Sequence, residues 1–181
     1  MKHFVQALLL FVLTTFLCGC PYCSPFNLDE TPLLNIDEDL VGNWATSPAN
    51  FKTSSNSLSQ KDVIIIFKKR TDMEYDVAVT GYINELRPYH LIHNDTINGT
   101  AYLSAIANRR FLNTFISGKV YISEIIKTNQ TISILPLAEY FTSKLIKNSK
   151  ELRSAVEFHY KVVLKPGYDH AFSLQNLQKI N

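Results

Sequence analysis

Hydrophobic and polar residues alternate in short blocks over most of the chain beyond residue 40. Residues 74–80 place a tyrosine and two valines on one face and polar residues on the other, the pattern of a strand with one buried face. Residues 63–67 form a continuous apolar run, which suits a strand covered on both faces. Residues 70–72 lie between the two runs and supply a turn, so the pair is predicted to form a β-hairpin.

Further strand patterns recur at similar spacing, with Asn108, Gly118 and Asn129 marking turns between them. They cover residues 40–44, 100–106, 111–117, 119–126, 131–135 and 171–177. Short strands at this spacing are typical of an antiparallel barrel or sandwich.

Helical spacing replaces the strand pattern after Pro136. A first helix is predicted from four apolar residues that recur at helical spacing, Leu137, Tyr140, Phe141 and Leu145. Asn148 or Ser149 can cap a second helix, and Glu151 suits its first turn. One face of that helix carries Leu152, Val156 and His159. The predicted fold class is α+β and mainly β: a small antiparallel barrel or curved sheet with two helices inserted before the last strand.

The first twenty residues follow a different pattern. Lys2 and His3 precede an apolar run, residues 4–17, which is the layout of an export signal. The run is shorter than the ~20 apolar residues of a membrane-spanning helix, so we expect a signal peptide rather than a retained transmembrane anchor.

The end of this run resembles the lipobox of bacterial lipoproteins. The residues that carry the resemblance are Leu17, Cys18, Gly19 and Cys20, with a cysteine where Ala, Ser, Thr or Val is usual. The resemblance implies a signal peptide at residues 1–19, a diacylglycerol on the Cys20 thiol, and a new amino terminus that can be acylated too. Two or three acyl chains make a stable anchor because each buried methylene contributes ~0.8 kcal/mol. The implied location is the cell envelope, at the outer membrane or the periplasmic face of the inner membrane. The alternative is a soluble secreted protein whose signal peptide happens to end in cysteine.

Residues 20–39 are predicted to form a flexible acidic tether, because they contain prolines, asparagines and five acids but no basic residue. Repulsion between these acids and anionic headgroups would hold the domain away from the bilayer. Residues 40–181 are then the strand-rich globular domain.

Residues 20–23 have the sequence Cys-Pro-Tyr-Cys, which matches the glutaredoxin active-site motif. A redox motif of this kind needs a preceding strand and a following helix whose N-terminus lowers the pKa of the thiol. An apolar run precedes it here and an irregular segment follows it, so redox chemistry is not predicted. If Cys20 is acylated, Cys23 is the one free thiol of the mature chain and no intramolecular disulfide can form.

Gly42 and Trp44 form a Gly-x-Trp start that resembles the first strand of lipocalin-like barrels. Lipocalins pair that tryptophan with a basic residue near the last strand, and the candidates are Lys165 and Lys179. The order of the elements is also similar to a family of uncharacterised bacterial lipoproteins. The points of likeness are residues 40–44, 110–113, 120–125 and 140–159. That family has no assigned activity, so the likeness carries no activity over to this chain.

Charge and motifs narrow the function classes further. Lys and Arg number 18 against 16 Asp and Glu, so charge gives no argument for nucleic acid binding. His90, His93 and Asp95 would suit a metal, but a zinc site needs further ligands at a clear spacing, and we predict solvated loop histidines. No nucleophile elbow, zinc-protease motif or phosphate-cradling loop occurs in the sequence. We therefore predict no catalytic residue, no metal ligand and no cofactor.

The remaining polar candidates have ordinary interpretations. His159 lies on the apolar face of the second predicted helix, where we expect a partly buried, hydrogen-bonded side chain. Asp169 and His170 are neighbours on an extended chain, so they point to opposite faces and cannot form a simple acid and base pair. The Asn-x-Thr sequons at Asn94, Asn98 and Asn129 matter only for a secreted eukaryotic chain.

Three functions remain open. The first is a binding module for an apolar ligand or a partner protein at the envelope, with Trp44, Tyr75, Phe111 and Phe115 as lining. The second is an envelope structural or assembly protein whose barrel is filled by side chains. The third is a hydrolase with an unrecognised site. An open apolar cavity favours the first function, a packed interior the second, and a polar cleft with clustered ionisable groups the third.

Overall fold

The computed structural model describes residues 22–46, 63–80, 96–142, 145–162, 167–169 and 172–180. The elements in chain order are β1 (Cys23–Ser24), η1 (Glu38–Leu40), β2 (Gly42–Thr46), β3 (Val63–Lys69), β4 (Tyr75–Thr80), β5 (Ile97–Ile106), β6 (Arg109–Ile116), β7 (Lys119–Lys127), β8 (Thr131–Pro136), η4 (Glu139–Phe141), α2 (Ser149–Val162) and β9 (Leu174–Ile180). None of the helices in these ranges is long and apolar enough to cross a membrane.

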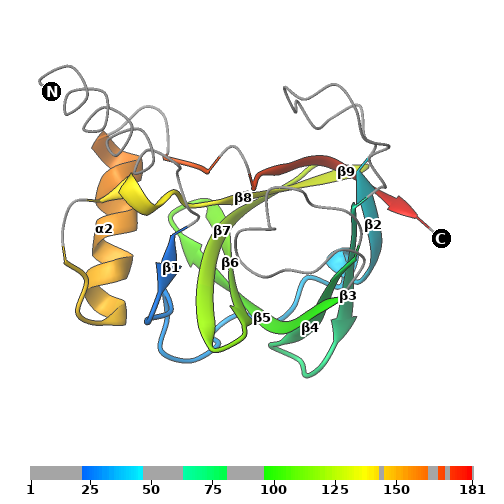
Figure 1. Cartoon of the computed structure of the whole chain (residues 1–181), viewed down its shortest axis with the longest axis horizontal. Coiled ribbons are helices and arrows are strands. Elements are labelled where there is room, and N and C mark those ends of the chain that lie inside the picture. Colours follow the sequence, from blue (N-terminus) through cyan, green and yellow to red (C-terminus); the bar gives the residue numbers. More distant parts are fainter. Residues whose placement is uncertain are drawn as a thin grey trace, which may run out of the picture.

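Strands β2 to β9 form a closed antiparallel barrel in which each strand pairs with the next along the chain (Figure 1). Pairing between β2 and β9 closes the ring, and it makes Trp44 the register partner of Lys179. A closed sheet has no free edge. An interior of about eight strands is small enough for side chains to fill.

The strand pattern of the sequence is confirmed. Each predicted strand corresponds to one of the eight barrel strands, with ends that differ by a few residues. The predicted hairpin is β3 and β4, and its turn is closed by the Arg70 N–H, which donates to the Glu74 carbonyl at 3.0 Å. Tyr75 and Val77 are buried while Asp76 is exposed, as the alternation predicted.

The second predicted helix is confirmed as α2. The Asn148 side chain caps it, because its Oδ1 accepts the backbone N–H of Glu151 at 2.8 Å. Leu152 and Val156 have no accessible surface and face the barrel wall.

The prediction of two helices is wrong, because α2 is the one α-helix within the described residues. Residues 137 and 138 stay extended, and the short 3-10 turn η4 follows them. The Leu137 N–H donates to the Ile122 carbonyl at 2.9 Å, and the Ala138 N–H donates to the Gly167 carbonyl at 2.8 Å. The backbone that would have started the helix is therefore already bonded to distant segments, and these bonds override the local apolar spacing.

Residues 22–41 lie along the barrel as an ordered segment, which we call the N-terminal strap, instead of the flexible tether expected for residues 20–39. Figure 1 shows it in blue and cyan, running from β1 around the barrel to β2. Cys23 and Ser24 pair with the first half of β7, whose second half pairs with β8. Leu28 is buried, and its N–H donates to Asn113 Oδ1 at 2.8 Å.

Ion pairs explain why the acidic composition does not keep the strap in solvent. Basic residues from other elements meet four of its five acids. The pairs are Asp29 with Arg153 (2.5 Å), Asp37 with Arg110 (2.8 Å), Glu38 with Lys69 (3.2 Å) and Asp39 with Lys127 (2.8 Å). These partners lie far away in the sequence, so the composition of the segment alone could not reveal them.

Two hydrophobic cores stabilise the fold. The first fills the barrel and includes Trp44, Phe67 and Tyr75. The second lies outside the barrel, where α2, the strap and strands β6 and β7 meet around Phe111 and Leu152. Helix α2 therefore covers one side of the barrel wall, as Figure 1 shows at the left.

Candidate functional site

The barrel interior is the place where the sequence predicted either a cavity or a filled core. The exposed fractions of Val63, Tyr75, Ile132 and Leu177 are all 0%, and that of Phe67 is 1%. An open cavity would leave accessible surface on the side chains that line it. The part of the interior built from these residues is therefore packed, and the rings of Phe67 and Tyr75 meet edge to face at 5.7 Å.

Only two of the four aromatic residues expected as lining face this interior. Trp44 and Tyr75 do so, whereas Phe111 and Phe115 lie on the outer side of β6. Leu112 takes the inward position on that strand, and side chains alternate between faces, so both phenylalanines must point outward. Phe111 contacts the ring of Tyr160 on α2 at 5.4 Å.

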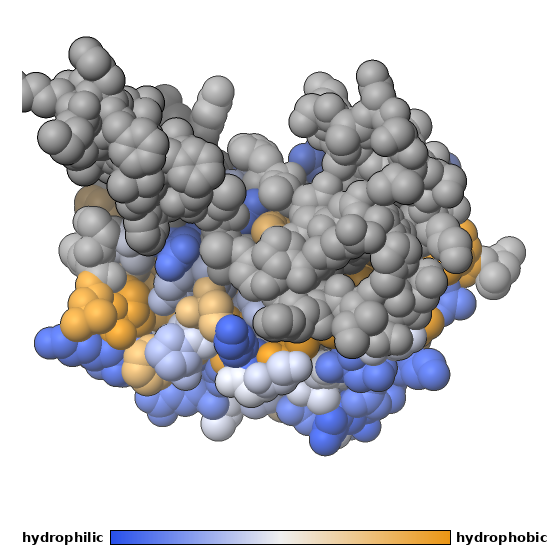
Figure 2. All heavy atoms as spheres, in the orientation of Figure 1, coloured by the Kyte–Doolittle hydropathy of each residue, from blue (hydrophilic) through white to orange (hydrophobic). Residues whose placement is uncertain are grey.

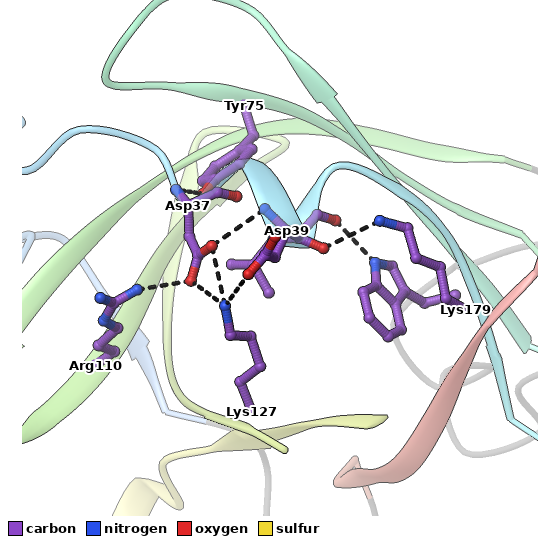
Figure 3. Close-up of polar contacts among 8 residues, drawn as sticks. Asp37, Asp39, Tyr75, Arg110, Lys127 and Lys179 are labelled. Atoms are coloured by element: carbon purple, nitrogen blue, oxygen red, sulfur yellow. Dashed lines mark hydrogen bonds and ion pairs between the residues drawn. The ribbon is translucent and has the colours of Figure 1, made fainter. Parts of the chain in front are cut away.

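A polar cluster seals the end of the barrel where the strap enters β2 (Figure 3). We call Asp37, Asp39, Arg110, Lys127 and Tyr75 the closed-end cluster. The Asp37 carboxylate accepts hydrogen bonds from Arg110 and Lys127, each at 2.8 Å. Lys127 also donates to Asp39 at 2.8 Å. The Tyr75 hydroxyl accepts the Asp37 N–H at 2.6 Å and donates to the Asp37 carbonyl at 3.2 Å.

Asp37 and Lys127 hold each other in their charged states. Burial alone would raise the pKa of Asp37, but the hydrogen bond from Lys127 and the nearby positive charges outweigh burial and lower it. The same hydrogen bonds raise the pKa of Lys127. Burial raises the pKa of Tyr75 to about 12, so its hydroxyl stays protonated at neutral pH. The closed-end cluster is thus a set of paired charges that fixes the strap to the barrel.

Trp44 lies beside the closed-end cluster and pairs with a basic residue of the last strand. Its indole N–H donates to the Leu40 carbonyl at 2.8 Å, and Lys179 Nζ lies 5.5 Å from the ring centroid. Of the two lysines considered in the sequence, Lys179 lies next to Trp44, and Lys165 lies outside the described residues. Gly42 lies next to Lys179, where a Cβ would come within 2.7 Å of Lys179 Cε, and its φ of +135° favours glycine.

A second polar cluster, consisting of Glu124, Arg109, Tyr160 and Tyr168, lies between the barrel wall and α2. Arg109 donates to both oxygens of the Glu124 carboxylate, at 2.9 and 3.1 Å. The Tyr160 hydroxyl donates to Glu124 Oε2 at 3.0 Å, and the Tyr168 hydroxyl donates to the same oxygen. The guanidinium carbon of Arg109 lies 4.4 Å from the centroid of the Tyr160 ring.

Burial is the main reason why the pKa values of Tyr160 and Tyr168 lie far above the ordinary value, and hydrogen bonding to neighbouring groups adds to it. Both hydroxyls therefore remain donors at neutral pH. The Glu124 side chain is 5% exposed and already accepts these donors, so the cluster ties α2 to the barrel and presents no nucleophile. Its members come from separate parts of the chain and form no local motif, so the sequence carries no signal for this cluster.

Several residues singled out in the sequence fall outside the described part of the chain. They are Cys20, His90, His93, Asp95 and His170. Within the described ranges no group of three or more His, Cys, Asp or Glu side chains could hold a metal ion.

Three further candidate residues from the sequence lie within the described ranges: His159, Asp169 and Cys23. His159 is partly buried, and its Nε2 accepts the Gly167 N–H at 2.8 Å, as expected. Burial lowers the pKa of His159. Asp169 is buried, and its N–H donates to the Pro136 carbonyl at 2.9 Å. Cys23 is an exposed free thiol.

Comparison with known proteins adds no family assignment. No family model matches the chain, and neither the curated proteins nor the solved structures gave a significant match.

Proposed function

We propose that this chain is a lipid-anchored bacterial envelope protein whose filled barrel is a rigid scaffold for a partner protein. The observation that carries the scaffold role is the packed interior, in which Val63, Tyr75, Ile132 and Leu177 have no accessible surface. A protein that carries an apolar ligand needs a cavity lined by such side chains. Here the same positions are used for packing.

The anchor part of the proposal rests on residues 1–20. The apolar run of residues 4–17 and the lipobox-like end at Cys20 support export, acylation and retention at a membrane. The strap begins two residues later at Tyr22, so the acylated residue would connect almost directly to the folded barrel.

The polar clusters support a scaffold rather than a hydrolase. A catalytic site needs a nucleophile or a base that is free to take a proton from substrate. In the closed-end cluster and around Glu124, the carboxylates already accept hydrogen bonds from arginine, lysine or tyrosine. These contacts fix the strap and α2.

Native mass spectrometry of the protein purified from its own host membranes tests both parts. We expect the mass of residues 20–181 plus a diacylglycerol, with or without a further acyl chain, and no bound apolar molecule. Mild crosslinking before purification should add the mass of a partner protein. An apolar ligand retained at one copy per chain would contradict the filled scaffold.

Substitution of the anchor residue tests acylation separately. Labelled palmitate should enter the wild type and the Cys23→Ser variant but not Cys20→Ser, because the thioether requires a thiol that serine lacks. Label on the Cys20→Ser variant, together with its recovery in membranes at the wild-type level, would contradict the anchor.

A second candidate, binding of an apolar ligand, is favoured by the barrel end opposite the closed-end cluster. Val79 and Leu174 pack on the interior core there and keep part of their surface accessible. Barrels of about eight strands hold one small ligand in lipocalins. Native mass spectrometry distinguishes this candidate from the filled scaffold, because it detects an apolar molecule bound to the chain.

A further inference from the structure

The point where the N-terminal strap begins is fixed on one side of the barrel. The Tyr22 N–H donates to the Leu137 carbonyl at 2.7 Å, and the Tyr22 ring meets that of Phe141 edge to face at 4.8 Å. Cys23 and Ser24 then pair with β7. A force applied to the chain just before Tyr22 is therefore transmitted to the α2 side of the barrel.

The distance between an acyl anchor and this point is short. Cys20 and Tyr22 are two residues apart, and an extended chain spans at most roughly 3.3–3.6 Å per residue, which gives about 7 Å. The headgroup region of one leaflet is about 5–7 Å thick, from the difference between the whole bilayer and its hydrocarbon core. If Cys20 carries the anchor, as proposed above, Tyr22 must lie at or next to the headgroups.

Helix α2, which contacts Phe141 beside Tyr22, carries an exposed aromatic residue. Phe141 contacts Tyr22 and also the His159 ring, at 6.3 Å between centroids. Phe158, which precedes His159 on the helix, is 60% exposed. Leu145, in the segment that leads into α2, is 81% exposed. Figure 2 shows an orange, hydrophobic patch at the left, on the side of α2, and further orange areas in the middle and at the right.

The outer face of α2 combines this apolar surface with lysines. Residues 150, 154, 158 and 161 are all exposed and follow one another at helical spacing, which places Lys150, Ser154, Phe158 and Lys161 on one stripe. Lys161 is also paired with Glu157 at 2.9 Å. An aromatic ring between lysines suits the membrane interface, where the ring enters the headgroup region and the ammonium groups attract anionic lipid.

We propose that the outer face of α2, centred on Phe158, rests on the phospholipid headgroups of the membrane that holds the anchor. The proposal rests on acylation of Cys20, and it adds an orientation that the anchor alone would not require. A flexible tether of about twenty residues would let the barrel turn freely up to about 65 Å from the bilayer. The ordered strap removes that freedom and holds the α2 side of the barrel against the membrane.

Fluorescence quenching in vesicles tests the orientation. The acylated Phe158→Trp variant is reconstituted into phosphatidylcholine and phosphatidylglycerol vesicles with bromine on the lipid acyl chains. We expect the added tryptophan to lose emission relative to vesicles without bromine. Wild-type protein gives the background, because Trp44 is 5% exposed within the barrel.

Met73→Trp is the matched control. Met73 is 41% exposed in the turn between β3 and β4, and β3 lies across the eight-stranded ring from β7. Its tryptophan should keep its emission in brominated vesicles. Ser154→Trp, one turn before Phe158 on the same stripe, should be quenched like Phe158→Trp and serves as the second variant if Phe158→Trp does not fold.

Failure of the anchor and failure of the orientation give different results. The mass of each preparation reports whether Cys20 carries a diacylglycerol, and its absence would overturn the anchor itself. Full acylation with equal emission losses for the α2 variants and Met73→Trp would overturn the orientation. A doubled native mass, with the α2 variants protected from quenching, would assign the face to a second copy of the chain and would also overturn it.

Discussion

Leu28 gives the sharpest test of the N-terminal strap. Its side chain is 1% exposed and belongs to the core between α2 and the barrel wall. In a flexible tether this residue would be solvated and its truncation harmless. In the structure, Leu28→Ala removes buried methyl groups and leaves a cavity next to residues of α2.

The expected cost follows from buried leucine truncations in general, which destabilise by ~2–5 kcal/mol depending on how far the site collapses. For a chain of this size, each kcal/mol lowers the melting temperature by about 2–4 °C. A loss of about 3 kcal/mol would therefore lower the melting temperature by roughly 6–12 °C.

Urea unfolding of the protein, followed by Trp44 fluorescence, measures this loss. Trp44 is a suitable probe because it is the one tryptophan of the chain and is buried in the barrel. Leu33→Ala is the matched control, since Leu33 lies in the same segment and is 66% exposed. Its free energy of unfolding should change by no more than about 0.5 kcal/mol. Equal stability of the two variants would refute the strap and restore the flexible tether.

Three further predictions concern the barrel and its polar clusters. Trp44→Ala should destabilise the fold by ~3–5 kcal/mol in denaturant unfolding followed by circular dichroism, and a wild-type midpoint would contradict its role in the core. Asp37 has a lowered pKa in the folded state, so its stabilising contribution is present above the unfolded pKa of about 3.9 and lost as pH falls through the folded value. The difference in melting temperature between wild type and Asp37→Asn should therefore be largest near neutral pH and shrink below about pH 4; a difference that does not change with pH would exclude the ion pairs as its cause. Glu124→Gln should lower the free energy of unfolding by ~1–3 kcal/mol in the same assay, because the amide NH2 replaces a carboxylate oxygen that accepts hydrogen bonds. An unchanged free energy of unfolding would show that the cluster does not hold α2.

The barrel strands could be predicted from the sequence because the pattern of apolar and polar residues within each strand is local. Alternation in residues 74–80 and the apolar run of residues 63–67 both depend on which face of a strand is covered. The helix expected at Leu137 failed for the opposite reason, since its backbone bonds to Ile122 and other residues distant in sequence. The prediction of a flexible tether failed because the partners of its acids, such as Arg153 for Asp29, are set by the fold alone.

The candidate sites also differ in how much of each could be predicted from the sequence. The sequence alone offered no way to choose between Lys165 and Lys179 as a neighbour of Trp44, and the register between β2 and β9 places Lys179 there. The Glu124 cluster had no signal in the sequence, because its members come from strands and a helix that meet only in the folded chain.

Closure of the barrel between β2 and β9 has a consequence for how the chain folds. Strand β2, which starts at Gly42, pairs with β3 on one edge and with β9, which ends at Ile180, on the other. The second edge of β2 therefore stays unpaired until β9 is present. Contacts between such distant residues give a high contact order, which slows folding because a long loop must close before the contacts form. A chain that crosses a membrane from its N-terminus would therefore expose unpaired strands until residues 174–180 have crossed.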